Sequence, residues 1–151
     1  MKRKAIVFDI DGVLLDTDFI WNEIEEKGLE GDKKWKYFYK YCNSGKIKII
    51  QGMFYIYNLI RFYDEISLIF LFCTARNENN KEKTILKLAH HGMYCDDIYM
   101  RNENDLRSDA EVKRDLLTEI QKEYKVIAFI DDKEDNCNMA KSLGIFSLRV
   151  V

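Results

Sequence analysis

The chain has 151 residues, of which 47% are hydrophobic and 13% aromatic, enough to bury a substantial core in one domain spanning residues 1–151. The formal net charge of -2 argues against electrostatic binding along a nucleic-acid duplex, although it does not exclude binding to the end of a nucleic-acid strand. No apolar run reaches the roughly 20 residues that a membrane-spanning helix needs, and the N-terminus leads straight into a strand, so we expect a cytoplasmic protein without a membrane segment.

The first predicted element is a buried strand that ends in two carboxylates. The apolar residues 5–8 are followed by Asp9, and Asp11 comes just before Gly12, which lets the chain turn and aim both carboxylates at one point. Carboxylates this close repel one another, and a bound Mg²⁺ is the simplest way to neutralise that repulsion. Taken alone, the D-x-D-G pattern is also compatible with a loop of solvated acids.

A helical insertion is predicted from about Thr17 to Glu65, with helices over about 18–27, from Asp32 as the N-cap to Cys42, and over 50–63. The insertion could form one wall of a cleft. Its aromatic side chains could stack on bases, but helical spacing favours core packing for Trp21, Trp35, Tyr37, Tyr39, Tyr41, Tyr55 and Tyr57. A solvated face is the simplest interpretation of its lysines, which are Lys33, Lys34, Lys36, Lys46 and Lys48.

A second buried strand is predicted over 67–72, and it runs into Thr74 and Arg76. A hydroxyl and a guanidinium therefore follow a strand end, as Asp9 does. The amphipathic helix that comes next, over 78–91, ends in His90 and His91, whose position favours interaction with the helix dipole over a metal or substrate role.

Ser108 and Glu111 form a capping box that starts a helix, after a short strand over 97–100 and a polar loop over 101–107. Lys113 lies in the first turn of this helix, where the dipole disfavours a cation by several tenths of a kcal/mol. A nearby anion such as phosphate would account for a lysine at this position.

The clearest strand covers 126–130 and ends in the second acid pair, Asp131 and Asp132. A helix over 133–143 and a last strand over 145–150 complete the pattern. Strands that alternate with helices in this way predict an α/β fold with a doubly wound, three-layer parallel sheet of Rossmann-like type. Four cysteines without C-x-x-C spacing indicate reduced thiols rather than a zinc site or disulfides.

These motifs resemble, in order, those of the haloacid dehalogenase (HAD) superfamily: D-x-D-x-[TV], a Thr or Ser after the second motif strand, a Lys, and an acid pair. The resemblance covers nearly the whole chain apart from the insertion. It implies a Mg²⁺-dependent phosphomonoesterase in which Asp9 attacks phosphorus to form an aspartyl phosphate and Asp11 is the general acid and base.

The same resemblance assigns the remaining site residues. Asp9, the backbone carbonyl of Asp11 and Asp132 would hold Mg²⁺, and Asp131 would orient these ligands. Thr74 and Lys113 would bind the phosphoryl oxygens.

Within the superfamily, the run from Tyr99 through Lys113 to Asp132 is similar to the 3′-phosphatase domain of phage-type polynucleotide kinase-phosphatases. This similarity implies a phosphorylated nucleic-acid end or nucleotide as substrate, in repair or processing. It suggests Arg76 and Arg107 as contacts for substrate, although either could instead be a surface ion-pair partner. The chain has no G-x-x-x-x-G-K-[ST] motif, so a kinase domain is not expected in it.

Two alternatives stay open at this point. The first keeps the chemistry but changes the substrate to a small phosphomonoester or a phosphoprotein. The second is a catalytically silent binding domain, against which the intact acids of all the motifs count.

Overall fold

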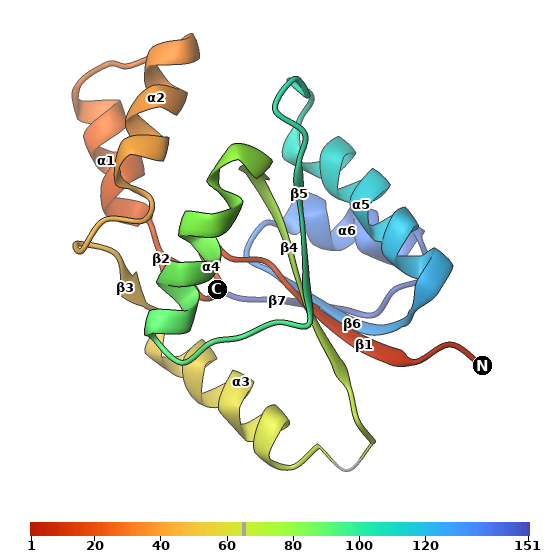
Figure 1. The fold of residues 1–151 in the computed structure, drawn as a ribbon. Coiled ribbons are helices and arrows are strands. Elements are labelled where there is room, and N and C mark those ends of the chain that lie inside the picture. Colours follow the sequence, from red (N-terminus) through yellow and green to blue (C-terminus); the bar gives the residue numbers. More distant parts are fainter. Residues whose placement is uncertain (65) are drawn as a thin grey trace.

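The computed structural model describes residues 1–64 and 66–151, and a five-stranded parallel sheet forms its centre (Figure 1). The strand order is β5-β4-β1-β6-β7. These strands are β1 (Lys4–Phe8), β4 (Ile69–Asn77), β5 (Asp97–Arg101), β6 (Lys125–Asp131) and β7 (Ser147–Arg149). The chain winds outward from β1 in one direction through β4 to β5 and then in the other through β6 to β7, so the predicted doubly wound sheet is confirmed.

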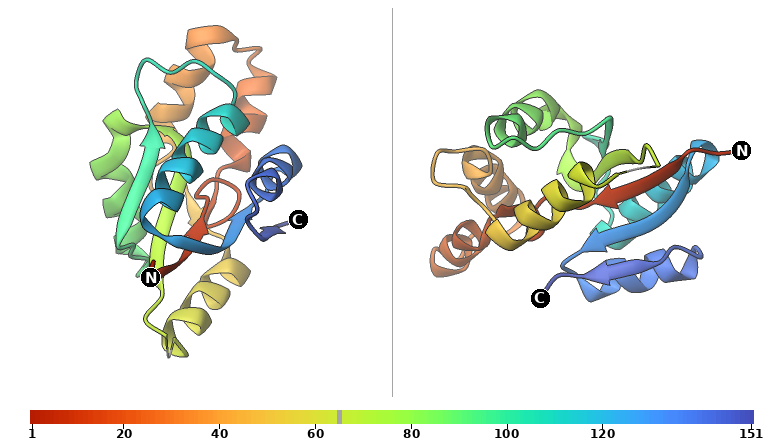
Figure 2. Two further views of the ribbon diagram at one scale, coloured as in Figure 1. Left: turned by 90° about the vertical axis from the view of Figure 1, so that its right-hand side faces the viewer. Right: turned by 90° about the horizontal axis from the view of Figure 1, so that it is seen from below.

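Helices cover both faces of the sheet, as the two views in Figure 2 show. The helices are α1 (Asp18–Glu26), α2 (Gly31–Tyr41), α3 (Gln51–Phe62), α4 (Lys81–His90), α5 (Asp109–Glu123) and α6 (Glu134–Ser142), with the short 3-10 helix η1 (Glu78–Asn80). Alternate side chains of a strand point to opposite faces, and β1 follows this rule. Ala5 and Val7 pack with α5 and α6, whereas Ile6 and Phe8 pack with α3 and α4.

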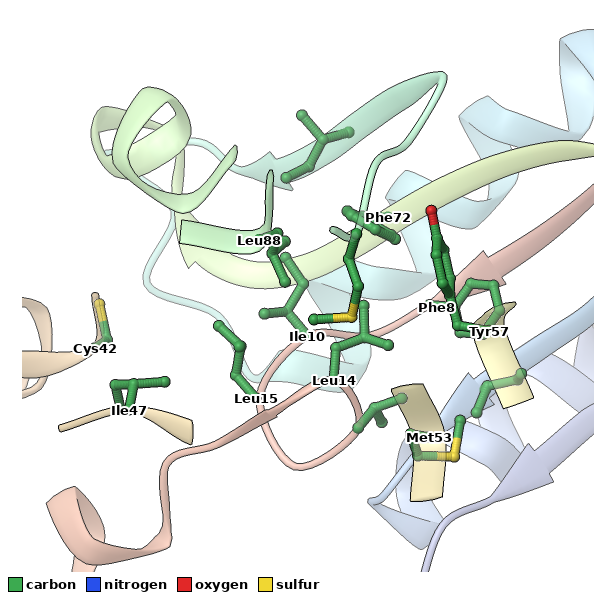
Figure 3. Packing of buried hydrophobic residues seen from close by; sticks show 14 of the residues in the cluster. Phe8, Ile10, Leu14, Leu15, Cys42, Ile47, Met53, Tyr57, Phe72 and Leu88 are labelled. Carbon is green, nitrogen blue, oxygen red and sulfur yellow. The ribbon is translucent and has the colours of Figure 1, made fainter. Parts of the chain in front are cut away.

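The larger core cluster fills the space between the sheet, α3 and the loop after β1 (Figure 3). Tyr57 of α3 is fully buried and packs edge-on against Phe8 at 5.8 Å between ring centroids. Its hydroxyl accepts a hydrogen bond from the backbone N–H of Tyr94. Tyr57 is thus a core residue, which is the interpretation that helical spacing favours for the aromatic side chains of the insertion.

The insertion differs from the purely helical prediction because it contains a small antiparallel ribbon. Strand β2 (Leu15–Asp16) pairs with β3 (Lys48–Ile49). Two-residue strands are too short to leave an alternating pattern in the sequence. The ribbon holds α1 and α2 together beyond the sheet, while α3 returns to cover the sheet face (Figure 1). Glu65, the last residue of the predicted insertion, lies outside the described residues.

Several predicted boundaries shift. Helix α2 begins at Gly31 with Glu30 as N-cap, so Asp32 lies in its first turn and the predicted N-cap is wrong. Strand β4 begins later than predicted and continues to Asn77, because pairing with β5 extends it. Thr74 and Arg76 therefore lie within the strand. The capping box of Ser108 and Glu111 at the start of α5 is confirmed.

His90 is the last residue of α4 and His91 its C-cap, at the helix end where the sequence placed them. All four cysteines are free thiols, as predicted. None of the helices within the described residues is both long and apolar enough to cross a bilayer.

Candidate active site

Asp9 lies immediately after β1, at the carboxyl edge of the sheet, and its backbone N–H donates to the carbonyl of Ile130 at 2.9 Å. The chain then makes a tight loop in which Leu14 and Leu15 both donate to the carbonyl of Ile10. This loop turns Asp11 back toward the strand ends, and both aspartates line one cavity. Open α/β sheets bind ligands at this edge.

Gly12 is the point where this loop meets the second acid pair. Its φ of +79° belongs to the left-handed region that residues with a Cβ rarely adopt. A Cβ built at this position would lie 2.3 Å from Asp132 Oδ2, which is a clash. The glycine thus allows the backbone of the loop to approach the Asp132 carboxylate.

Lys113 lies between two buried carboxylates, although it comes from near the N-terminus of α5, as its fifth residue rather than in the first turn that the sequence predicts. Its Nζ is 3.0 Å from Asp9 Oδ1 and 2.6 Å from Asp131 Oδ2, and the residue is 2% exposed. Burial by itself would lower the pKa of Lys113, but the charges of Asp9 and Asp131 outweigh burial and raise its pKa above the ordinary value. The ammonium therefore stays charged at neutral pH.

Asp131 is saturated by protein donors. Asn136 Nδ2 donates to both of its carboxylate oxygens, at 3.1 and 3.0 Å, and the backbone N–H of Lys133 donates to Oδ1 at 2.9 Å. Together with Lys113, these donors fix a carboxylate that is completely buried. Such a group is well suited to orienting its neighbours.

Three carboxylates converge in the arrangement that a hard cation prefers. Oxygens of Asp9, Asp131 and Asp132 lie within 4.8 Å of one another. Oδ1 of Asp132 is buried without a hydrogen-bond partner among the described residues. Three carboxylates beside the single ammonium of Lys113 leave a local charge of -2, which one divalent cation would neutralise. The donor set therefore fits Mg²⁺.

The pKa values of these acids reflect the same crowding. Burial raises the pKa of Asp9 well above the ordinary carboxylate value, the charges of Asp131 and Asp11 raise it further, and Lys113 opposes them. Burial and the charge of Asp131 likewise raise the pKa of Asp132. A bound cation would favour the ionised forms of these carboxylates.

Arg76 is 2% exposed and holds Asp11 with two hydrogen bonds: Nε donates to Oδ2 at 2.8 Å and Nη2 to Oδ1 at 2.6 Å. Its other N–H groups donate to Asn43 Oδ1, to Thr84 Oγ1 and to the carbonyl of Cys42. A guanidinium has five N–H donors, and these five bonds engage all of them. Arg76 thus joins the loop after β1, α4 and the segment after α2, with no donor free for a substrate.

Thr74 and Arg107 lie in different surroundings. Thr74 is buried in β4 and lines the cavity with Asp9, and its Oγ1 accepts a hydrogen bond from the backbone N–H of Arg76 at 3.1 Å. Arg107 is on the surface loop after β5, where it pairs with Asp105 at 2.8 Å and Asp115 at 2.7 Å. It lines a neighbouring cavity, so it is not brought to the acid cluster.

A second group of charged residues, which the sequence did not single out, lies beside the cavity. Arg101 donates to the carbonyls of Ala75, Asp105 and Arg107 and to Asp109 Oδ1. Asp109, in the first turn of α5, lines the cavity and also accepts from Lys133 Nζ. An acid in a first helical turn is common for local reasons, so the sequence carried no separate signal for this pair.

The cavity has a volume of about 480 Å³, within the range of small-ligand sites. The carboxyl edge of the sheet supplies Asp9, Thr74 and Asp132, and the N-terminal half of α5 supplies Lys113. The helices α1 and α2 form the facing wall, which consists of Thr17, Asp18, Trp21, Lys34, Trp35, Phe38 and Tyr39. The predicted insertion thus supplies one wall of a cleft.

A comparison with protein families matches residues 3–151 to the family described as the polynucleotide kinase PNKP phosphatase domain. The chain belongs to this family. It is therefore a phosphatase domain of HAD type, and the resemblance inferred from its motifs is confirmed. A search of curated proteins found no match.

Several solved structures are similar in fold to this PNKP-type phosphatase domain at low sequence identity. A chain of the Pnkp1/Rnl/Hen1 RNA repair complex is 22% identical with a TM-score of 0.74, covering 99% of this chain but only 42% of that one. A haloacid dehalogenase-like hydrolase from Streptococcus pneumoniae is 18% identical, with a TM-score of 0.68 and coverage of 99% and 85%. The class C acid phosphatase from Bacillus anthracis is 17% identical, with a TM-score of 0.63 and coverage of 97% and 67%.

Proposed function

We propose that this phosphatase domain is Mg²⁺-dependent and removes a terminal phosphate, at the 3′ position, from a nucleic-acid end or a nucleotide. The observation that carries the proposal is the convergence of Asp9, Lys113 and Asp132 in the cavity that Asp11 and Thr74 also line. The similarity to a chain of the Pnkp1/Rnl/Hen1 RNA repair complex supports the substrate class.

In the proposed reaction, a carboxylate oxygen of Asp9 forms a bond to phosphorus, and the bond from phosphorus to the leaving alcohol breaks. Asp11 enters this step in its protonated form and gives its proton to that alcohol oxygen. In the second step Asp11 removes a proton from water, the water oxygen attacks phosphorus, and the bond to Asp9 breaks to release phosphate. Two moderate barriers thereby replace one very high barrier.

The other residues of the cavity hold these groups in place. Lys113 and the Thr74 hydroxyl would bind the phosphoryl oxygens, on which negative charge is spread in the transition state. Asp9, the backbone carbonyl of Asp11 and Asp132 would hold Mg²⁺, and the saturated carboxylate of Asp131 would orient them. The ion would neutralise the repulsion between the phosphate dianion and the carboxylates. We assign to Arg76 the positioning of Asp11 in place of a direct substrate contact.

The decisive experiment follows phosphate release from a 3′-phosphorylated oligonucleotide. Asp9→Asn should lower kcat by about a thousandfold or more, because the amide cannot act as the nucleophile. EDTA should abolish the wild-type activity, and added Mg²⁺ should restore it. The matched control is Asp97→Asn, which alters a carboxylate at the opposite end of the sheet, at the start of β5, and should leave kcat unchanged.

Turnover by Asp9→Asn at the wild-type rate would reject Asp9 as the nucleophile. Faster hydrolysis of glycerol 2-phosphate than of the oligonucleotide would favour a small-molecule phosphatase. Absence of hydrolysis for every substrate in the presence of Mg²⁺ would favour a silent binding domain.

A further inference from the structure

Trp35 does not behave as the core residue that its helical spacing predicts. It belongs to the apolar stripe of α2 with Phe38, yet Phe38 is 3% exposed and Trp35 is 40% exposed. Trp35 lines the cavity that contains Asp9, and it also lines the neighbouring cavity beside Arg101 and Arg107. A large aromatic ring is thus presented to both spaces, which core packing does not explain.

The ring is held in place by other aromatic side chains. Trp35 lies nearly perpendicular to Trp21 and to Phe38, at centroid distances of 5.7 and 6.3 Å. Trp21 and Phe38 stack on each other at 4.9 Å. Tyr39 ties this cluster to the sheet because its hydroxyl accepts a hydrogen bond from the backbone N–H of Asn77 at 2.8 Å. The wall formed by α1 and α2 is therefore preorganised. Aromatic rings form much of its surface.

A cation accompanies the ring. Lys34 Nζ is 4.9 Å from the centroid of the Trp35 ring, and Lys34 lines the same cavity. Proteins that bind single-stranded nucleic acids combine these two features: an aromatic ring stacks on a base, and a neighbouring cation meets the sugar-phosphate backbone. The cavity of about 480 Å³ is also larger than one phosphate group requires, so it leaves room for the alcohol that carries the phosphate.

We propose that Trp35 is a specificity-determining residue that stacks on the base of the terminal nucleotide, while Lys34 contacts the phosphodiester on its 5′ side. This inference rests on the proposed phosphatase function and names the class of leaving group: a nucleoside with a planar base. A leaving group without a ring would gain nothing from Trp35, so the preference arises from the wall formed by α1 and α2.

The test compares kcat/KM for a nucleoside 3′-monophosphate and for glycerol 2-phosphate, which also has a secondary alcohol as its leaving group but lacks a base. Trp35→Ala should lower the ratio of these two values by about tenfold or more, mainly through KM of the nucleotide, since stacking on one base contributes that much. Trp35→Phe should retain most of the ratio because phenylalanine still offers a ring. Tyr55→Ala removes an exposed aromatic ring on α3, outside the cavity, and should leave the ratio unchanged.

Lys34→Gln tests the proposed contact between Lys34 and the phosphodiester of an oligonucleotide. It should raise KM for a 3′-phosphorylated oligonucleotide more than KM for the mononucleotide, which has no phosphodiester. Equal effects on both substrates would overturn the assignment of Lys34.

The inference is overturned if Trp35→Ala keeps the wild-type ratio, or if Trp35→Ala and Trp35→Phe lower kcat/KM for both phosphates equally, because the ring would then serve only the fold. These outcomes differ from failure of the proposed function, in which the wild-type protein releases no phosphate or Asp9→Asn remains active. A wild-type protein that hydrolyses both phosphates through Asp9 without preference would overturn the stacking subsite and leave the phosphatase chemistry intact.

Discussion

The residue that best illustrates the conflict between local and tertiary preference is Lys113. A cation near the N-terminus of a helix opposes the helix dipole by up to several tenths of a kcal/mol. The two carboxylates within 3.0 Å of its Nζ reverse that preference, since each would be a costly buried charge without a partner. Lys113 thus stabilises the anionic residues that the proposed chemistry uses, and it would also bind the phosphate that enters.

Gly12 allows a prediction at the same scale. Gly12→Ala introduces strain of about 1–2 kcal/mol at a positive φ and a Cβ 2.3 Å from Asp132 Oδ2. We expect the Asp132 carboxylate to move and to bind Mg²⁺ less well. The Mg²⁺ concentration that gives half-maximal activity should therefore rise about tenfold or more, which is the loss of affinity typical of a metal site whose supporting residues are disturbed. A Mg²⁺ titration of phosphatase activity measures this. Gly52→Ala, in open space on α3, is the control, and an equal shift there would contradict the argument.

At the scale of elements, one side chain connects the insertion to the carboxyl edge of the sheet. Arg76 extends from β4 and contacts the loop after β1, α4 and the two residues that follow α2. Asn43 and Cys42 therefore lie at a fixed distance from Asp11. The wall formed by α1 and α2 is positioned by this contact as well as by the β2–β3 ribbon.

Arg76→Lys tests this connection. Lysine has three donors where arginine has five, so buried acceptors lose their partners and we expect a loss of about 3–5 kcal/mol in the free energy of unfolding. Urea denaturation measures the loss. Arg107→Lys, which alters an exposed ion pair, should cost less than about 1 kcal/mol.

The same variant separates positioning from stability. If Arg76 positions Asp11 as the proton donor, then kcat should fall more for an alkyl phosphate than for p-nitrophenyl phosphate, whose leaving group needs no proton. Equal losses for both substrates would indicate that Arg76 serves only the fold.

For the whole molecule, the strand order decides which residues meet. Because β1 lies between β4 and β6, the carboxyl ends of these three strands bring together Asp9, Thr74 and Asp131, which are far apart in the sequence. The resulting site carries more negative than positive charge, which opposes folding until a cation binds.

Metal binding should therefore stabilise the entire domain. With Mg²⁺ at about a hundred times its Kd, the folded state gains about 2.7 kcal/mol, which raises Tm by several degrees in a domain of this size. Thermal unfolding with and without Mg²⁺ measures the shift. Asp132→Asn, which replaces one of the clustered carboxylates, should reduce the shift by more than half, and an undiminished shift would place the ion elsewhere.

The amino-acid sequence by itself determined the parallel sheet, the acid pairs at two strand ends, the capping box of α5 and the membership of a phosphatase family. These are local features: apolar runs and helical periodicity record which face of an element is buried, and strand ends can be read from where such a run stops. Asp9, Thr74 and Asp132 were identified because each follows an apolar run, and Lys113 because it lies near the start of a capped helix.

Only the tertiary structure decided what each buried side chain meets. The spacing of α2 marked Trp35 and Phe38 as one stripe, but the position of α1 and the cavity left Trp35 exposed and Phe38 buried. Arg76 was assigned to a substrate contact or a surface pair, and it proved to be buried because its acceptors come from segments up to 65 residues away. A sequence pattern records the preference of a residue for burial, whereas its partners depend on the packing of distant elements.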